Sequence, residues 1–329
     1  MNLKAVQIEE FGGPEVLKTT TIEEPNPNEN EVKIKLHAAG LNPNEAYTIS
    51  GNYGFFVPDL PYVPGFDGAG TIEKVGKNVK HFKEGDRVFL SAFSAKRNTG
   101  TYAEKVVTDA EYVYPLPENV SFTEGAALGI PVFTAYRALF QKAKIKAGEI
   151  VLIHGASGSV GSTAVQMAKA VGAIVIGTSS TEEGRKRIRS LGADYALNHI
   201  SKENKEELAK ITQDQGPDAI IEILANANLE TDTEIIADHG RVIVVGSRDT
   251  IEIDPRNLMT NQASITGMNI IYPSKEHLRE IIYGVSAFLK TEAVKPLIGN
   301  KFTLDRIQEA YKDMMESSGN GRTMLVLTE

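Results

Sequence analysis

One segment, Ile150–Gly161, constrains the fold of this chain more than any other. Its first four residues, Ile150–Ile153, are all apolar, which is typical of a parallel strand buried on both faces. Small residues follow, and from Val160 to Val171 apolar residues recur at helical spacing. A strand, a glycine-rich turn and a helix in this order predict a dinucleotide-binding turn, because the N–H groups at a helix start bind a diphosphate.

The glycines of this turn have separate expected roles. A side chain at Gly158 would keep phosphates from approaching, and a bulky residue at Gly161 would push the helix off the strand. The first glycine of the usual G-x-G-x-x-G pattern is Ala156 here, so the motif alone leaves open a glycine-rich turn that binds nothing. The expected contacts to the cofactor from this turn are Ser157, Gly158, Ser159, Val160 and Gly161.

The length and composition of the chain limit the number of domains and the kinds of site that it can contain. The chain has 329 residues, which suits two domains, and its 41% hydrophobic and 24% charged residues predict an ordinary core. It has no cysteine, which excludes disulfides, thiolate catalysis and cysteine-ligated zinc. No apolar run is long enough to cross a bilayer, and a predicted strand begins at once, without a signal peptide. We therefore expect a cytoplasmic protein with no membrane partner.

The net charge of −8 disfavours non-specific electrostatic binding to nucleic acid. The cluster of basic residues within Arg185–Arg189 could form a local basic patch, or it could be the solvated face of a helix.

The predicted elements divide the chain. Residues 1–124 are expected to be all-β, punctuated by glycine and proline, as in a compact barrel or sandwich. The strands expected there are Lys4–Ile8, Glu31–Ala39, Ala69–Val75, Arg87–Phe89 and Tyr102–Val107. Residues 125–267 alternate strands and helices, which predicts a doubly wound parallel sheet of six strands. Those strands are Ile150–His154, Ile174–Thr178, Tyr195–Leu197, Ala219–Glu222, Arg241–Val245 and Ser264–Thr266.

The last segment, about residues 268–329, is expected to complete the first domain, so that residues 125–267 form an insertion. Its elements are two helices and one strand, Lys275–Lys290, Leu304–Ser317 and Thr323–Leu327. The last helix and strand are too short to form a domain by themselves.

The second strand of the parallel sheet indicates which dinucleotide binds. It ends in Thr178–Thr181, without the acid that an NAD site uses for the ribose 2′-hydroxyl. Hydroxyl groups such as that of Ser180 can donate to a 2′-phosphate, and Arg185 or Lys186 lies close enough in sequence to neutralise it, so we predict NADPH rather than NADH. Alternatively, Ser179 and Ser180 cap the next helix, whose acidic first turn would repel a phosphate that it faced.

Short motifs are spread along the whole chain. They are FGGPEVL at 11–17, AAGLNP at 38–43, PYVPG at 61–65, KEGDRV at 83–88, GAALGIP at 125–131, FTAYRA at 133–138, TEEG at 181–184, GRVIVVGSR at 240–248 and TIEIDP at 250–255. On these motifs the chain resembles the medium-chain dehydrogenase/reductase superfamily over its full length. Within it, the chain is most similar to the zinc-independent, zeta-crystallin-like NADPH:quinone oxidoreductase branch.

The resemblance implies an α/β protein with a Rossmann domain and a GroES-like β-barrel catalytic domain. It further implies NADPH in the cleft between the two domains, and a homodimer or homotetramer.

Zinc is not expected. Zinc-dependent relatives carry a cysteine near the Asn42 position and a G-H-E segment, which here is Gly65–Asp67 with Phe66 at its centre. Phenylalanine cannot ligate a metal, and without a Lewis acid alcohol oxidation is disfavoured. Hydride transfer from the cofactor to an electron-poor acceptor, such as a quinone or an activated alkene, remains feasible.

The resemblance assigns Asn42, Tyr47 and Tyr53 to the surroundings of the nicotinamide and the acceptor. Asn42 would orient a water or an acceptor carbonyl, Tyr47 would donate a hydrogen bond to the cofactor, and Tyr53 would shape the acceptor slot. The alternative is that they are loop residues at the rim of a domain. No proton donor is assigned, because a reduced quinone oxygen can take its proton from water.

Other cofactor contacts are also implied by the resemblance. Thr134 would contact the nicotinamide region, or it would only cap the helix after Pro131, and His199 would lie by the adenosine half. Further contacts follow the fourth and fifth parallel strands, where ligands bind in such sheets; these are Asn228, Val245, Gly246, Ser247 and Arg248.

Two residues have no role in this scheme. No partner pattern is visible for His154, which we expect to be buried and hydrogen-bonded rather than catalytic. Arg322 would either reach the cofactor phosphate or be solvated.

The function predicted first is an NADPH-dependent quinone oxidoreductase. An enoyl or enone reductase of the same superfamily is the enzymatic alternative. Binding of AU-rich RNA is raised by the resemblance and disfavoured by the acidic composition. A purely structural, crystallin-like role is a third alternative.

Overall fold

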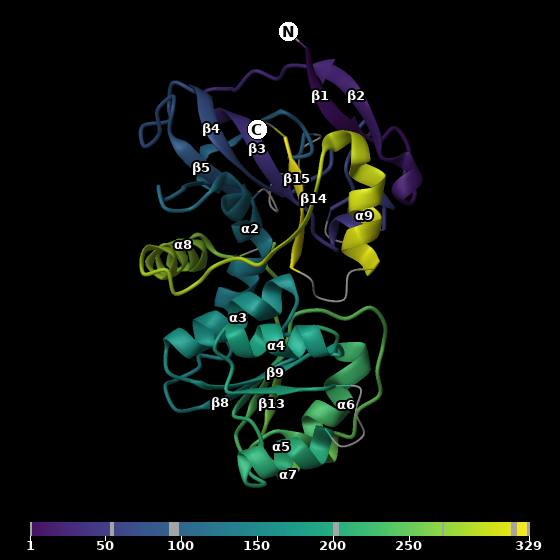
Figure 1. Ribbon diagram of the computed structural model, residues 1–329, viewed down its shortest axis with the longest axis vertical. Helices are drawn as coiled ribbons and strands as arrows, with labels where there is room; N and C mark the ends of the chain where they lie inside the picture. The colour runs from purple at the N-terminus through teal and green to yellow at the C-terminus, as the bar shows by residue number, and fades with distance from the viewer. Residues whose placement is uncertain are drawn as a thin grey trace. The chain divides into compact units, whose positions relative to one another are not determined.

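The computed structural model describes residues 2–52, 56–91, 99–199, 204–271, 273–316 and 321–327. The chain forms two compact units (Figure 1). Unit 1 comprises Met1–Ile130 and Pro296–Glu329, and unit 2 comprises Pro131–Lys295, so unit 2 is inserted into unit 1. Helix α8 (Lys275–Lys290) has the bounds expected from the sequence and belongs to unit 2 rather than to the segment that completes unit 1.

Unit 1 is built on antiparallel strands. Its larger sheet has the order β14-β15-β3-β4-β5-β7, with β6 also paired to β3, and β1 pairs with β2 in a separate ribbon. The bounds are β1 (Asn2–Gln7), β2 (Lys18–Glu23), β3 (Glu31–Gly40), β4 (Asp67–Val75), β5 (Arg87–Ser91), β6 (Lys105–Asp109), β7 (Val113–Pro115), β14 (Ile298–Phe302) and β15 (Arg322–Val326). Short helices connect them, including α1 (Glu45–Ile49) and α9 (Ile307–Glu316).

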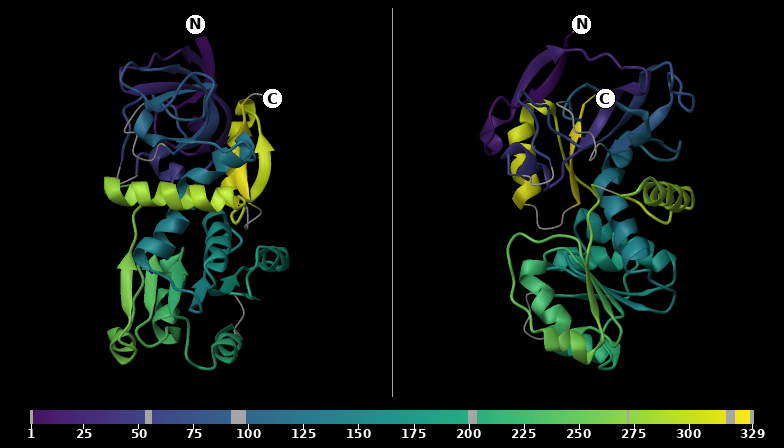
Figure 2. Two further views of the ribbon diagram at one scale, coloured as in Figure 1. Left: turned by 90° about the vertical axis from the view of Figure 1, so that its left-hand side faces the viewer. Right: turned by 180° about the vertical axis from the view of Figure 1, so that it is seen from behind.

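The C-terminal segment is part of the unit 1 sheet. Strand β15 pairs antiparallel with β3, with Met324 opposite Gly40, and parallel with β14. Helix α9 packs on the same strands through the buried side chains of Ala310 and Met314. Figures 1 and 2 show this yellow segment beside the purple N-terminal strands in every view. Residues from the two ends of the chain therefore share one core.

Unit 2 contains the expected parallel sheet of six strands, in the order β10-β9-β8-β11-β12-β13. The strands are β8 (Ile150–Ile153), β9 (Ile174–Thr178), β10 (Tyr195–Leu197), β11 (Ala219–Glu222), β12 (Arg241–Val244) and β13 (Ser264–Gly267). The helices between them are α3 (Ser159–Ala170), α4 (Glu182–Ser190), α5 (Asn204–Thr212), α6 (Ala225–Ile235) and α7 (Pro255–Thr260). Because the strand order reverses direction between β8 and β11, ligands are expected at the carboxyl ends of these two strands.

Apolar side chains cover both faces of this sheet. Leu152, Ile176 and Ile220 lie on the face that packs against α5 and α6, with Leu208 among the buried residues. Right-handed crossovers place α3 and α4 on the opposite face, and the views in Figure 2 show helices on both sides. The sheet is therefore doubly wound, as the sequence predicts.

Helix α2 (Phe122–Tyr136) begins earlier than expected. Ser121 and Glu124 form a reciprocal cap, in which Glu124 N donates to Ser121 Oγ at 3.2 Å and Ser121 N donates to Glu124 Oε2 at 2.8 Å. The helix is kinked at Gly129 and continues past Pro131. Thr134 is therefore inside a helix, so the expectation that it is an N-cap is wrong.

No helix among the described residues is long and apolar enough to span a lipid bilayer.

Candidate functional site

The turn between β8 and α3 is tightly folded. Gly155 has a φ of +56°, which favours glycine, and Ala156 N donates to Thr178 O at 2.9 Å. A Cβ atom added to Gly161 would lie 2.4 Å from Gly155 O and 2.6 Å from Ala156 Cα. Gly161 is therefore required by the packing of the helix start against the backbone of its own turn.

Gly158 differs from Gly161. An added Cβ would have one neighbour within 4 Å, Gly155 O at 3.3 Å, so the protein itself leaves space there. Gly158 is the N-cap of α3 and has no side chain that could accept a hydrogen bond from the first turn of the helix. The open space and the uncapped helix start together form a cradle that a phosphate group fits.

The end of β9 carries a compact polar cluster. The N-cap of α4 is Thr181, whose Oγ1 accepts from Gly184 N at 3.0 Å, so the expectation that Ser179 and Ser180 cap this helix is wrong. The hydroxyl groups of Ser179 and Ser157 are 3.1 Å apart and buried, which joins the turn after β8 to the end of β9.

Arg185 folds back over the end of β9. Its Nη1 donates to the carbonyl oxygens of Ser179 and Ser180 at 3.1 and 3.2 Å. Its Nη2 lies 2.7 Å from Glu182 Oε2, so the acidic first turn of α4 is paired with the arginine. The guanidinium therefore lies at the strand end where a 2′-phosphate is expected, and a carboxylate competes for it.

Asn226, which we did not expect from the sequence, joins the segments after β11 and β12 through hydrogen bonds. Asn226 Oδ1 accepts from Arg248 N at 2.9 Å, and Asn226 N donates to Ser247 Oγ at 3.1 Å. Ala225 N donates to the carbonyl oxygen of Gly246 at 2.9 Å. Asn226 precedes Asn228 by two residues in the same A-N-A-N segment, which is the one sequence signal that pointed to it.

A cavity of about 140 Å³ lies at the carboxyl ends of β8 and β10. It is lined in part by His154, His199 and Asn228, so two residues that the resemblance assigns to the cofactor line one space. Burial lowers the pKa of His199, as do the charges of His154 and Arg185, which favours its neutral form.

His154 is buried and hydrogen-bonded, as expected, but its partners were not visible in the sequence. Its Nε2 is 2.8 Å from Asp232 Oδ1 and 3.6 Å from Glu222 Oε2. Burial lowers the pKa of His154, but the charge and hydrogen bond of Asp232 outweigh it, so the net shift is upward. Burial raises the pKa of Glu222 to about 7. Two carboxylates therefore converge on this histidine through the fold, from positions that no local sequence pattern connects with it.

In unit 1, Asn42 is buried in a hydrogen-bonded network. Its Nδ2 donates to Glu45 Oε1 at 3.2 Å and to Asp67 Oδ2 at 3.0 Å, and its Oδ1 accepts from Arg322 Nη2 at 2.8 Å. Tyr47, two residues further along α1 than Glu45, is 43% exposed. Tyr53 lies outside the described residues.

Arg322 lies at the centre of that network and is only 2% exposed. It donates to the carbonyl oxygens of Gly40, Leu41 and Ala126 and lies 2.5 Å from Asp67 Oδ2. Both expectations for Arg322 are therefore wrong: it is neither solvated nor available to a cofactor phosphate.

Phe66 and Asp67 belong to the same hydrogen-bonded network as Asn42. Asp67 Oδ1 accepts from Ser91 Oγ at 2.7 Å, and Oδ2 accepts from Asn42, Arg322 and the N–H of Ile130. Phe66 is buried and apolar.

Glu45 is a fully buried carboxyl group in the same network. One oxygen accepts from Asn42 Nδ2 and Phe66 N, and the other accepts from Asn42 N and the hydroxyl of Tyr102. Burial raises the pKa of Glu45 to about 7, against the hydrogen bonds from Tyr102 and Asn42, which favour the ionised form.

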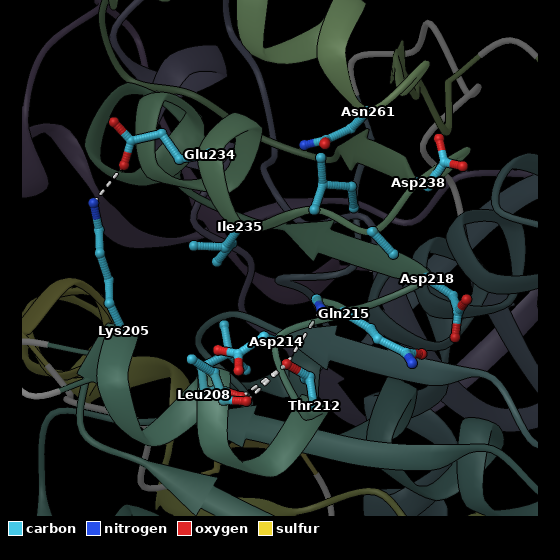
Figure 3. Close-up of a pocket in the computed structure, with 14 residues that line it drawn as sticks. Lys205, Leu208, Thr212, Asp214, Gln215, Asp218, Glu234, Ile235, Asp238 and Asn261 are labelled. Atoms are coloured by element: carbon cyan, nitrogen blue, oxygen red, sulfur yellow. Dashed lines mark hydrogen bonds and ion pairs between the residues drawn. The ribbon is translucent and has the colours of Figure 1, made fainter.

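A larger cavity, of about 740 Å³, lies elsewhere in unit 2 (Figure 3). Its lining includes Asp218, just before β11, and Asp238, before β12, and Lys205 and Glu234 form an ion pair within it. It is therefore at the amino ends of the strands, whereas ligands of such sheets bind at the carboxyl ends. We do not assign the cofactor to it despite its size.

Comparisons with known proteins agree with this geometry. Two family models match, "Alcohol dehydrogenase GroES-like domain" over residues 28–118 and "Zinc-binding dehydrogenase" over residues 159–285. The quinone oxidoreductase of Homo sapiens is 45% identical over 326 residues, which cover 99% of this chain and 98% of that protein.

Two solved structures are similar over nearly the full chain. A quinone oxidoreductase of Pseudomonas syringae pv. Tomato DC3000 has a TM-score of 0.85 and 27% identity, and covers 98% of this chain and 99% of that chain. A mycobacterial protein solved in complex with NADPH has a TM-score of 0.87 and 25% identity, with the same coverage.

Proposed function

The chain belongs to the quinone oxidoreductases of the medium-chain dehydrogenase/reductase superfamily, and from this premise we propose that it transfers a hydride from NADPH to quinones without a metal ion. The observation that carries the proposal is the full-length likeness to quinone oxidoreductases, joined to a turn after β8 that fits a diphosphate. When bound, the nicotinamide supplies the hydride.

The proposed diphosphate contacts are the backbone N–H groups at the start of α3. The uncapped helix start and the space over Gly158 support this assignment, because they leave donors and room for an anion. The binding residues proposed there are Ser157, Gly158, Ser159, Val160 and Gly161.

We propose that Ser180 and Arg185 hold the 2′-phosphate that distinguishes NADPH from NADH. The absence of an acid at the end of β9 supports this, as does the guanidinium of Arg185 over that strand end. The remaining proposed cofactor contacts are Tyr47, Thr134, His199, Asn228, Val245, Gly246, Ser247 and Arg248.

The residues at the usual zinc position do not fit a metal ion, and we propose that turnover needs none there. Phe66 has no donor atom, both oxygens of Asp67 accept hydrogen bonds, and both amide hydrogens of Asn42 are donated within the network. The family model named for zinc matches residues 159–285, which contain none of these three positions.

On the acceptor side, we propose that Tyr47 donates a hydrogen bond and that Tyr53 shapes the slot. Because the amide of Asn42 is held by Glu45, Asp67 and Arg322, we assign it the positioning of the loop before α1. No side chain is assigned as proton donor, since water can protonate the reduced oxygen.

The experiment is a comparison of initial rates with NADPH and NADH across ortho-quinones, para-quinones, enones and enoyl thioesters, with and without a chelator. We expect turnover of NADPH with quinones that persists in the chelator. Failure to oxidise NADPH with any quinone would refute the proposal, and preferential reduction of enones or enoyl thioesters would identify the chain as an enone or enoyl reductase.

We also propose a homodimer or homotetramer. Strand β13 is the last strand of the parallel sheet, and a sheet edge is a template for pairing with a second copy. Native mass spectrometry tests this, and a monomer at micromolar concentration would refute it.

A further inference from the structure

Three ionisable side chains meet below the carboxyl ends of the central strands of unit 2. His154 follows β8, Glu222 ends β11, and Asp232 lies within α6. One potential ligand atom from each lies within 4.8 Å of the other two. All three side chains are buried, and the two carboxylates are completely inaccessible to solvent.

Two carboxylate oxygens of this cluster accept no hydrogen bond among the described residues, and one of them, Glu222 Oε2, lies 3.6 Å from His154 Nε2. The other is Asp232 Oδ2, and both are buried. A buried charged oxygen without a hydrogen bond is strongly unfavourable. Burial raises the pKa of Glu222, as do the charge of Asp232 and a hydrogen bond with it, while the charge of His154 opposes them. A proton or a further cation would compensate the two buried carboxyl groups.

We propose that His154, Glu222 and Asp232 bind one divalent transition-metal ion, for which zinc is the test ion. An imidazole nitrogen with two carboxylate oxygens is a donor set that zinc and its neighbours accept. The three ligand atoms lie within 4.8 Å of one another, so small shifts would bring each to about 2.0–2.2 Å from a common ion. Nε2 of His154 would then exchange its 2.8 Å hydrogen bond to Asp232 for a bond to the ion.

The groups around the cluster fit this assignment. Glu222 Oε1 accepts from Leu224 N and from Asn228 Nδ2, which holds the carboxylate in place. His154 Nδ1 is 3.4 Å from Thr178 Oγ1, so the second ring nitrogen faces a polar group, as in most metal-binding histidines.

Of the three residues, His154 lines the cavity of about 140 Å³, so an ion entering from that cavity would pass the imidazole before it reached the two carboxylates. A bound ion would join β8, β11 and α6. This proposal does not rest on the proposed function, because none of the three residues is assigned to hydride transfer or to the cofactor.

The test uses the full chain, stripped with a chelator, dialysed and held near pH 8. Zinc is expected to raise the thermal midpoint, and cobalt is expected to give the visible absorption of a four- or five-coordinate ion. In Glu222→Gln and in Asp232→Asn we expect both effects to be lost, with zinc affinity reduced more than about 100-fold, which exceeds the usual loss from changing a residue that only orients a ligand.

Glu234→Gln is the matched control. Glu234 lies on the same helix as Asp232 and is paired with Lys205 outside the cluster, so the charge change is identical. The responses to zinc and cobalt should be unchanged in this variant. If the cluster variants fail to fold, X-ray absorption of the zinc-loaded wild type replaces them, and scattering from one coordinated imidazole is expected.

Two outcomes overturn the proposal. Equal responses in wild type, Glu222→Gln and Asp232→Asn would show that the ions bind elsewhere. No response in the wild type, together with an infrared band of a protonated carboxyl group that Glu222→Gln removes, would show that a shared proton occupies the cluster instead.

Discussion

At the scale of single residues, the side chains nearest to the expected chemistry have partners that local sequence patterns do not reveal. Asn42 donates to Asp67, which is 25 positions away, and His154 contacts Asp232, which is 78 positions away. Glycine spacing and strand ends pointed to the turn after β8, because those signals are local. The partners of Asn42 and His154 depend on the tertiary fold, so no pattern within a window of sequence contains them.

The first prediction at this scale concerns Arg185. Arg185→Gln should raise the KM for NADPH about 10- to 100-fold and leave the KM for NADH nearly unchanged, because it removes charged hydrogen bonds worth about 1.5–3 kcal/mol to the 2′-phosphate alone. Steady-state kinetics with both cofactors measure this. Lys186→Gln removes the same charge from an exposed position on α4 and should change little. Equal losses with both cofactors in Arg185→Gln would contradict the assignment.

Glu182→Gln should act in the opposite direction, because it releases Arg185 from a competing carboxylate at 2.7 Å. We expect a lower KM for NADPH in this variant, measured in the same assay. An unchanged or higher value would mean that the ion pair helps to position the arginine.

The buried carboxyl group of Glu45 should make the stability of the protein depend on pH. The pKa of this carboxyl group is raised from 4.5 to about 7 by burial, so the folded state binds its proton more tightly than the unfolded state does. Its contribution to stability is therefore complete below about pH 4.5 and is lost as the pH rises through 7, a change of about 3 kcal/mol at about 1.4 kcal/mol per unit.

Urea unfolding of the wild type and of Glu45→Gln, at about pH 5 and about pH 8, measures this contribution. Glutamine cannot titrate, so the difference in free energy of unfolding between the two proteins should depend on pH in this sense. The variant is also expected to be less stable throughout, because its amide accepts at one oxygen only. Parallel pH profiles would show that Glu45 does not titrate in this range.

At the scale of elements, apolar patterns predicted the buried strands well and the exposed strands poorly. The expected strand Ile174–Thr178 has the same bounds as β9, which is mostly buried. By contrast, β2 has the sequence KTTTIE with mostly exposed side chains, and β7 has only three residues, so neither shows a clear apolar alternation. A strand whose side chains are buried on both faces of a sheet has a run of apolar residues, and this run can be recognised in the sequence.

The β8–α3 turn allows a matched pair of glycine substitutions. Gly161→Ala should destabilise the fold, because its Cβ would lie 2.4 Å from Gly155 O in a backbone contact that cannot yield easily. Gly158→Ala should fold normally, with its closest contact at 3.3 Å, but it should bind NADPH more weakly because the methyl group occupies the phosphate approach. Thermal unfolding and cofactor titration separate the two effects. Normal NADPH binding by Gly158→Ala would contradict the proposed diphosphate position.

At the scale of the whole molecule, the chain closes unit 1 by returning to it after unit 2 is complete. Arg322, at the start of the last strand, binds Asp67 across 255 positions and reaches the carbonyl oxygens of Gly40 and Leu41. The length of the last segment already indicated that it is too short to fold alone. It did not indicate that one buried arginine joins this segment to the first strands, because an isolated arginine near a glycine is usually solvated.

This connection leads to the last prediction. Arg322→Met should lower the free energy of unfolding by about 3–5 kcal/mol, because it leaves the carboxylate of Asp67 buried without its cation, and Asp67→Asn should cost a similar amount for the converse reason. The double variant should cost much less than the sum, since neither buried charge is then left alone. Urea unfolding followed by circular dichroism measures all three, with Arg306→Gln, at an exposed pair, as a control that should change little. Additive losses would show that the two side chains stabilise unit 1 independently, and that the buried ion pair does not hold the two ends of the chain together.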